Sequence, residues 1–141
     1  MSLDNFDWSQ VDSVISSHTE YLLKSQREDG GWGLQRESLL SSPQNTGEAL
    51  SALLKKTDLT DEEENAIERG IRFLIDNQCQ DGGWPRAKRS PSGDFQGQII
   101  ATSWAIQALF KSLGLYEKYE RFDPKFKETI VDKIKKHKIL Y

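Results

Sequence analysis

The sequence predicts an all-α domain built from repeated helical hairpins, and two observations support this fold class. The phrase from Gln26 to Trp32 (QREDGGW) recurs from Gln78 to Trp84 (QCQDGGW), so the two tryptophans stand 52 positions apart. Each copy follows a stretch whose apolar residues recur at about 3.6-residue intervals, which indicates an amphipathic helix. An internal repeat of this length is typical of proteins that stack one supersecondary unit on the next.

The repeated phrase has the chemistry of a turn between two helices. Asp-Gly-Gly is a strong turn signal because glycine adopts positive φ at little steric cost. The tryptophan beyond it is large and is expected to be buried, and the glutamine amide can tie the backbone ends of neighbouring helices together. We therefore interpret the following residues as a structural repeat motif: Gln26, Asp29, Gly30, Gly31, Trp32, Gln78, Asp81, Gly82, Gly83 and Trp84.

Apolar periodicity and turn signals predict one domain, residues 1–141, with two hairpins and one further helix. The first repeat covers about 8–56, the second about 60–114, and the extra C-terminal helix about 124–138. His18 falls on the apolar stripe of the first helix, where a histidine is usually packed or hydrogen-bonded in the core.

The two helices of the second repeat carry further signals. Thr60 and Glu63 form a capping box at a helix start, which accounts for the acidic run that follows Thr60 without a metal ion. The helix at 98–113 is nearly apolar around its middle, so we expect it to be the most buried helix, with Gly114 as its C-cap.

Composition excludes several classes of protein. Hydrophobic residues make up 36% of the chain and charged residues 29%, which is typical of a globular protein. The net charge of −3 does not favour a nucleic-acid binder, and no apolar run is long enough to predict a transmembrane segment. The single cysteine, Cys79, is compatible with the reducing cytoplasm. Lysines at the end of the last helix leave a membrane-peripheral location open.

Gln-x-x-Asp-Gly-Gly-Trp at the end of a helix resembles the QW motif of squalene-hopene and oxidosqualene cyclases. The segments 42–54 and 101–109 look like the inner helices that follow such motifs, and the resemblance covers about 14–115. It implies an α/α toroid, of which about five helices form only a part, most like the C-terminal part of a hopene cyclase. Prenyltransferase β subunits, complement thioester domains and some polysaccharide lyases share this architecture, so the resemblance is specific for the fold rather than for a reaction.

The motifs that would carry cyclase chemistry are absent. The sequence contains neither the Asp-x-Asp-Asp motif of hopene-type cyclases nor the Asp-Asp-x-x-Asp motif of ionising terpene synthases. The candidate acids are Glu48 and Asp94. Glu48 aligns with Trp104, where the family has an aromatic residue, and the resemblance places both of these side chains on the central cavity. A buried Glu48 could act as an acid, whereas a Glu48 that faces solvent would not. No metal site and no cofactor are expected.

Different functions stay open at this point. The first is a truncated, non-catalytic module that binds an apolar or isoprenoid ligand or a protein partner. The second is an enzymatic function, in which the chain supplies part of a cyclase or lyase active site that is completed by oligomerisation, with Glu48 or Asp94 as the acid. A purely structural module is the third. Because two hairpins do not close a toroid, we expect a small partial bundle, a homo-oligomer or a part of something larger.

Overall fold

Five α-helices and no strands make up the described part of the chain, which confirms the all-α prediction. The computed structural model describes residues 8–33, 40–56, 58–80, 82–85, 95–118 and 123–137. The helices are α1 (Trp8–Ser25), α2 (Pro43–Leu53), α3 (Asp61–Asp76), α4 (Phe95–Lys118) and α5 (Pro124–His137). No described helix combines the length and the apolar character that crossing a membrane requires.

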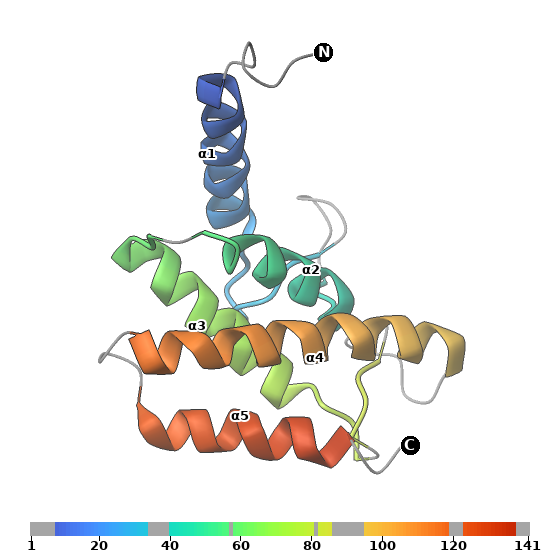
Figure 1. Ribbon diagram of the computed structural model, residues 1–141. Coiled ribbons are helices and arrows are strands. Elements are labelled where there is room, and N and C mark those ends of the chain that lie inside the picture. The colour runs from blue at the N-terminus through green and yellow to red at the C-terminus, as the bar shows by residue number, and fades with distance from the viewer. Residues whose placement is uncertain are drawn as a thin grey trace, which may run out of the picture.

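The helices α2 and α4 form an inner pair on which α3 and α5 pack. The helix α2 lies along α4, α3 contacts both of them, and α5 lies against α4. In Figure 1, α4 and α5 run side by side, α3 passes behind α4, and α1 projects away from the other four helices. The helix α1 therefore meets the rest of the domain at its C-terminal end.

The core lies between α2, α3, α4 and α5, and small residues let the inner helices approach closely. Ala49 of α2 and Ala105 and Ala108 of α4 are buried in it, together with both tryptophans of the repeated phrase. A Cβ atom on Gly47 would lie 2.7 Å from the backbone carbonyl of Trp104. Only glycine therefore permits this approach of α2 to α4.

The start of α3 has the predicted capping box. The Thr60 hydroxyl accepts a hydrogen bond from the Glu63 backbone N–H, and the Glu63 carboxylate accepts one from the Thr60 backbone N–H. These two bonds satisfy backbone donors that have no partner inside the helix. The capping box fixes the first turn of α3.

Three packing expectations are wrong. The helix α4 continues past Gly114 because Leu115 packs against the core, and a glycine inside a helix costs only about 1 kcal/mol. One face of α4 is open, since Ile99 is 54% exposed and Phe110 is 68% exposed, so α4 is not buried all round. His18 is exposed because the side of α1 that carries it faces a groove rather than a packed helix.

Candidate functional site

The first Gly-Gly-Trp motif (residues 26–32) ties the end of α1 to the middle of α3. The side-chain amide of Gln26 donates to the Gly30 carbonyl at 3.0 Å and to the Ala66 carbonyl of α3 at 2.8 Å. Both amide hydrogens are thereby used, one within the motif and one across to the next outer helix. The sequence predicted a link between helix ends, but the carbonyl on α3 lies within the helix.

The tryptophan of the first motif connects α1 to α2. The indole Nε1 of Trp32 donates to the Leu22 carbonyl of α1 at 2.8 Å. Its backbone N–H donates to the Thr46 hydroxyl of α2 at 2.9 Å. The indole ring is buried, so these bonds are shielded from water and hold the two helices at a fixed distance.

The second Gly-Gly-Trp motif (residues 78–84) makes the same four side-chain bonds one repeat further along. It ties α3 to α4 and α5 where the first motif ties α1 to α2 and α3. The bonds run from Gln78 Nε2 to the Gly82 and Lys133 carbonyls (2.9 Å each), from Trp84 Nε1 to the Leu74 carbonyl (2.6 Å), and from the Trp84 N–H to the Thr102 hydroxyl (2.8 Å).

One glycine in each motif adopts a backbone conformation that other residues rarely adopt. Gly30 has φ of 90° and Gly82 has φ of 92°, and no other described residue has positive φ. A Cβ atom on Gly30 would also clash with the Arg69 carbonyl oxygen. Glycine is therefore required at Gly30 by both the backbone angle and the close approach of α3.

The two motifs differ in how the glutamine oxygen is satisfied. In the first motif Arg69 donates to Gln26 Oε1 at 3.3 Å and to the Arg27 carbonyl at 2.8 Å. In the second motif Gln78 Oε1 is buried and has no hydrogen-bond partner among the described residues. The Lys133 carbonyl accepts from Gln78 as the Ala66 carbonyl accepts from Gln26. Lys136 follows Lys133 by three positions, as Arg69 follows Ala66, so Lys136 corresponds to Arg69.

Asp29 completes the first motif, and its counterpart Asp81 lies outside the described residues. The carboxylate of Asp29 accepts from the Gly31 backbone N–H at 2.9 Å and from the Ser41 hydroxyl at 2.8 Å. These bonds fix the turn against the segment that leads into α2. In both motifs the glutamine amide and the indole N–H donate to backbone carbonyls.

Sequence reasoning missed the threonines as partners of the tryptophans. Thr46 and Thr102 are buried, and each accepts the backbone N–H of the tryptophan in its own repeat. Their matching places in the two repeats were a usable signal, because a polar residue that recurs on an apolar helix face usually has a fixed partner.

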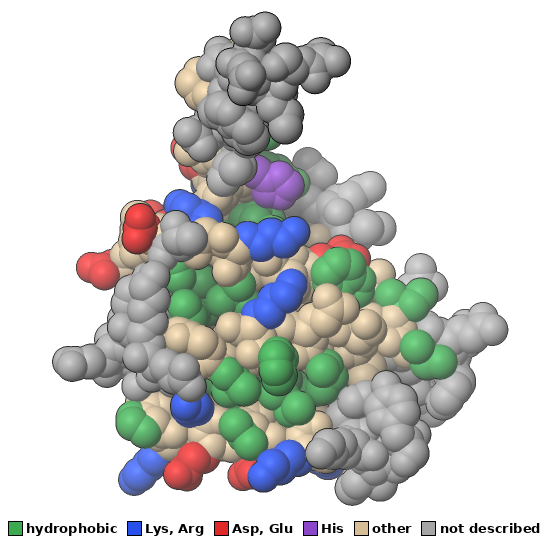
Figure 2. Space-filling model, in the orientation of Figure 1, with side chains coloured by type: hydrophobic (Ala, Val, Ile, Leu, Met, Phe, Trp, Pro, Cys, Tyr) green, Lys and Arg blue, Asp and Glu red, His purple; other side chains and the backbone are tan. Residues whose placement is uncertain are grey.

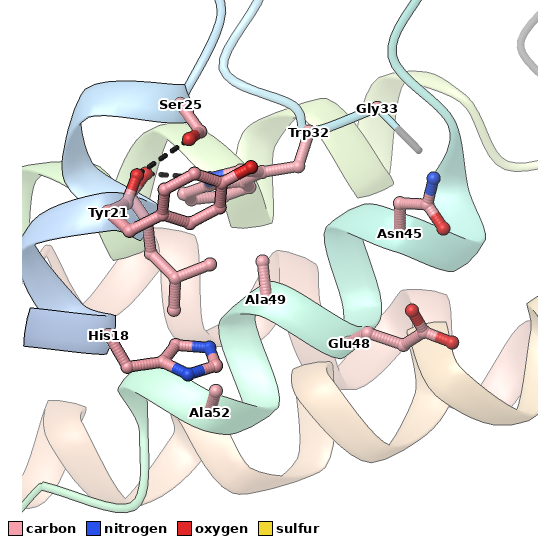
Figure 3. A pocket seen from close by; sticks show the side chains of 10 residues that line it. His18, Tyr21, Ser25, Trp32, Gly33, Asn45, Glu48, Ala49 and Ala52 are labelled. Atoms are coloured by element: carbon pink, nitrogen blue, oxygen red, sulfur yellow. Dashed lines mark hydrogen bonds between the residues drawn. The ribbon is translucent and has the colours of Figure 1, made fainter. Parts of the chain in front are cut away.

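An open groove lies between α1 and α2, which we call the α1–α2 groove. In Figure 3, His18 and Tyr21 project from α1 toward α2, and Ala49 and Ala52 of α2 face them. One part of the groove has a cavity volume of about 240 Å³ and includes Glu48 at its edge. The groove is lined by side chains and is not filled by any described segment.

The groove continues into a second, larger part of about 550 Å³. Leu22, Ala52 and His18 line both parts, so the two parts form one continuous depression along α2. Val14 adds apolar surface at the larger part, and Lys55 stands beside it. Val14 is 66% exposed, which is unusual for a residue on the apolar stripe of a helix.

The candidate acids do not form an enclosed acid site in the described structure. Glu48 is exposed, and in Figure 3 its carboxylate points away from His18. Trp104 is partly buried, with its backbone against Gly47. Asp94 lies outside the described residues. Among the residues that the structure describes, no three metal-ligating side chains come together.

Glu63 and Glu64 are buried at the start of α3, and the contacts of the Glu63 carboxylate serve α3 rather than the groove. Burial raises the pKa of Glu63, but hydrogen bonds from Lys56 and from Thr60 outweigh burial and hold this pKa below its ordinary value. Lys56 Nζ lies 2.5 Å from the Glu63 carboxylate. Glu63 is therefore an ionised anchor for the start of α3.

The described part of the chain is thus an all-α structure in which two Gly-Gly-Trp motifs make matching hydrogen bonds. Residues 1–117 match the family model of the squalene-hopene cyclase C-terminal domain. The chain belongs to this family, which confirms the resemblance seen in the sequence. No solved structure gives a significant match to the chain.

Proposed function

We propose that this member of the cyclase family is a non-catalytic binding module that holds an apolar α-helix of a protein partner in the α1–α2 groove. The observation that carries the proposal is the internal repeat. Residues of α1 correspond to residues of α3 that stand 52 positions later, and residues of α2 to residues of α4 that stand 56 positions later. The groove residues can therefore be compared with their counterparts in the second repeat.

The counterparts of the groove residues are covered by a helix, namely α2. His18, Leu22, Ala49 and Ala52 correspond to Gly70, Leu74, Ala105 and Ala108, and all four counterparts are buried. The helix α2 packs on both α3 and α4.

Two close contacts show how α2 lies on the second repeat. A Cβ atom on Gly70 would lie 2.7 Å from Leu50 Cδ2 of α2. Gly47 of α2 lies against the backbone of Trp104, and Glu48 corresponds to Trp104 in the first repeat. The groove has the form of a helix-binding position because its counterpart holds a helix, and burial of its apolar lining would stabilise the complex.

The absence of cyclase motifs from the sequence supports a binding role without chemistry. Glu48 and Asp58 are the carboxylates that line the groove, and both are exposed to solvent. A catalytic acid gains its reactivity from burial or from a fixed partner. An active site shared between copies, with Glu48 or Asp94 as its acid, remains the alternative.

A second candidate function is the binding of a small apolar molecule, such as an isoprenoid, in the same groove. The cavity volume of about 550 Å³ in its larger part falls within the range of ligand pockets, roughly 300–1,000 Å³. Val14, Leu22 and Ala52 would contact such a ligand, and Lys55 stands where a polar head group could lie. The two candidates differ in the class of molecule that fills the groove.

A competition between two probes tests the proposal. The first probe is a stapled helical peptide with the α2 sequence, residues 43–54, and the second is farnesol. Backbone amide shifts in the NMR spectrum report binding. We expect the peptide to shift His18, Leu22 and Ala52 saturably, whereas farnesol leaves them unchanged.

Ala52→Trp fills the groove and should abolish these shifts, because Ala52 lines both of its parts. Glu128→Trp places the same side chain on the exposed surface of α5 and should leave peptide binding intact. Shifts with farnesol alone would favour the small-molecule function. A groove that responds to neither probe would overturn both candidates.

A further inference from the structure

We infer that the partner helix in the α1–α2 groove carries an arginine, whose guanidinium binds Glu48 and Asn45 at one end of the groove. The inference rests on the proposed function and names the chemistry of the partner. It starts from the smaller part of the groove, which we call the anchor pocket and which Tyr21, Asn45, Glu48 and Ala49 help to line. Its volume of about 240 Å³ lies below the roughly 300–1,000 Å³ of small-molecule pockets, so it suits one long side chain.

Two hydrogen-bond acceptors stand together at one end of the anchor pocket. Asn45 and Glu48 are three positions apart on α2, so their side chains are neighbours on one side of the helix. In Figure 3 the two side chains lie one above the other, and the amide oxygen of Asn45 is on the side of the Glu48 carboxylate. No described residue forms an ion pair with Glu48 or a hydrogen bond with the Asn45 side chain. Both oxygens can therefore accept hydrogen bonds from a partner.

The charge of the anchor pocket favours a cation. At neutral pH, Glu48 carries the only formal charge among the residues that line this pocket. The larger part of the groove is lined by Lys55, Lys56 and Asp58, so the negative charge is not continued there. A guanidinium holds five N–H donors in one plane and can bind a carboxylate through two of them, which a lysine ammonium does not do. Arginine therefore fits the two acceptors better than lysine.

The counterpart of the anchor pocket in the second repeat has no such acceptors. Asn45 and Glu48 correspond to Ala101 and Trp104, so the second repeat offers apolar side chains at these two places. The helix that covers it is α2, which has no charged residue before Glu48. Where the lining changes from apolar to acidic, a helix that covers it is matched by a basic residue in place of a neutral one.

The contact between α2 and α4 gives the position of this basic residue. Gly47 lies against the backbone of Trp104, and the two helices run in the same direction in Figure 1. Pro43, one turn before Gly47, is buried and lies about one turn back along α4. By the repeat, the same place in a partner helix is beside Asn45, and an arginine there reaches Glu48.

A second copy of this chain does not supply the partner helix. The helix α2 of each copy already lies on α4 of the same chain. The helix α5 flanks α4 as α3 flanks α2, so α5 would occupy the place of α1 of a second copy. Figure 2 shows hydrophobic side chains gathered over α4 on the face turned to the viewer, and the counterpart of Pro43 on α4 is Ile99 rather than a basic residue. The partner is therefore a different protein.

Two peptides that differ in one charge test the inference. Both are stapled helices with the α2 sequence, residues 43–54, in which position 43 is changed. The first carries Pro43→Arg, and the second has citrulline at the same position, which keeps the shape of arginine but not its charge. Titrations of the full chain, followed by NMR amide shifts, give the two dissociation constants. We expect the arginine peptide to bind about fivefold more tightly, which is the upper end for an exposed ion pair.

Glu48→Gln in the full chain removes the negative charge and should bring the two dissociation constants together. Glu128→Gln, at an exposed position of α5, is the matched control and should keep the fivefold difference. Equal binding of the two peptides to the wild-type chain, or a difference that persists in Glu48→Gln, would overturn the inference and leave the proposed function standing. Binding of neither peptide would overturn the proposed function and the inference with it.

Discussion

The helices α1 and α3 enter the same turn motif and yet are packed very differently. In each helix a backbone carbonyl, that of Leu22 in α1 and that of Leu74 in α3, accepts a hydrogen bond from the N–H of a buried indole. In α3 the residue one position before that leucine, Phe73, is buried, but the equivalent Tyr21 of α1 is 51% exposed. The motif therefore fixes the end of a helix, whereas burial of the helix body depends on the neighbouring inner helix.

The rest of each helix shows the same contrast. The helix α3 begins with a capping box and an ion pair between Lys56 and Glu63. It then lies against both inner helices. The helix α1 projects away from the bundle in Figure 1. The side chain of its residue Val14 is exposed, whereas that of the equivalent residue of α3, Ala66, is buried. The comparison predicts that α3 is fixed at both ends and along its length, and that α1 is fixed at one end.

The largest expected effect tests whether the two motifs are equally important. Trp32→Ala and Trp84→Ala each remove a buried indole and its hydrogen bond, so each should lower the free energy of unfolding by about 3–5 kcal/mol. Urea unfolding followed by circular dichroism measures the loss. Phe110→Ala, at an exposed site, should change stability by less than about 0.5 kcal/mol in dilute protein. A tryptophan variant as stable as the parent would show that its motif does not hold the domain together.

The next effect concerns the anchor that α3 has in Glu63. Glu63→Gln should destabilise the domain by about 1.5–3 kcal/mol at neutral pH, because hydrogen bonds to a charged group are lost. The pKa of Glu63 is lowered in the folded state, so its contribution is fully present above the unfolded pKa and is lost as pH falls through the folded pKa.

The stability difference between the parent and Glu63→Gln should therefore shrink below about pH 4. Urea unfolding at a series of pH values measures this trend, with the exposed Glu62→Gln as the control in the same helical turn. A difference that stays constant down to acid pH would mean that the charge of Glu63 does not stabilise α3.

A smaller pair of effects tests the equivalence of the threonines. Thr46→Val and Thr102→Val keep the side-chain shape but leave the tryptophan N–H without its acceptor. Each should cost about 1–3 kcal/mol of unfolding free energy, because a buried donor loses its partner. The Thr129 hydroxyl donates to the exposed Lys125 carbonyl of α5. Thr129→Val should therefore lower the unfolding free energy by less than about 0.5 kcal/mol. Thermal unfolding of the three variants gives the comparison, and unequal losses at the two motifs would break their equivalence.

The smallest expected effect comes from a substitution that gives the buried Gln78 oxygen of the second motif a hydrogen-bond donor. Lys136→Arg places a guanidinium where Arg69 stands in the first motif and offers a donor to the buried Gln78 Oε1. We expect a gain of about 0.5–1.5 kcal/mol in unfolding free energy. Lys135→Arg, at an exposed position beside it, should leave stability unchanged. Equal melting temperatures for the two variants would show that Gln78 does not need this partner.

Much of the fold could be predicted from the sequence, because the turns and the helix start depend on residues that are close together in the chain. Glycine at Gly30 and Gly82 signals positive φ, and a tryptophan after such a turn is expected to be buried. The capping box at Thr60 is equally local. The hydrogen-bond partners of the motif residues lie up to 55 positions away, so they required the structure.

The groove could not be predicted, because local pattern does not say whether a neighbour is present. Val14 and Tyr21 occupy apolar positions like those of α3, and only the arrangement of the helices leaves them exposed. Gly114 favours the end of a helix, but α4 continues past it because the following Leu115 packs against the core. Glu48 and Trp104 occupy equivalent positions in the two repeats, but the surface beside each depends on which helix covers it.

Native-state hydrogen exchange in dilute, monomeric protein tests the difference between α1 and α3 most directly. Amides in the middle of α3, residues 68–72, should open only with global unfolding, because inner helices cover that helix. The equivalent amides of α1, residues 16–20, should exchange by local opening at a much lower free energy, and should become protected when the groove is filled. Protection of α1 equal to that of α3 in the monomer would contradict the conclusion that the motif fixes only the end of the helix.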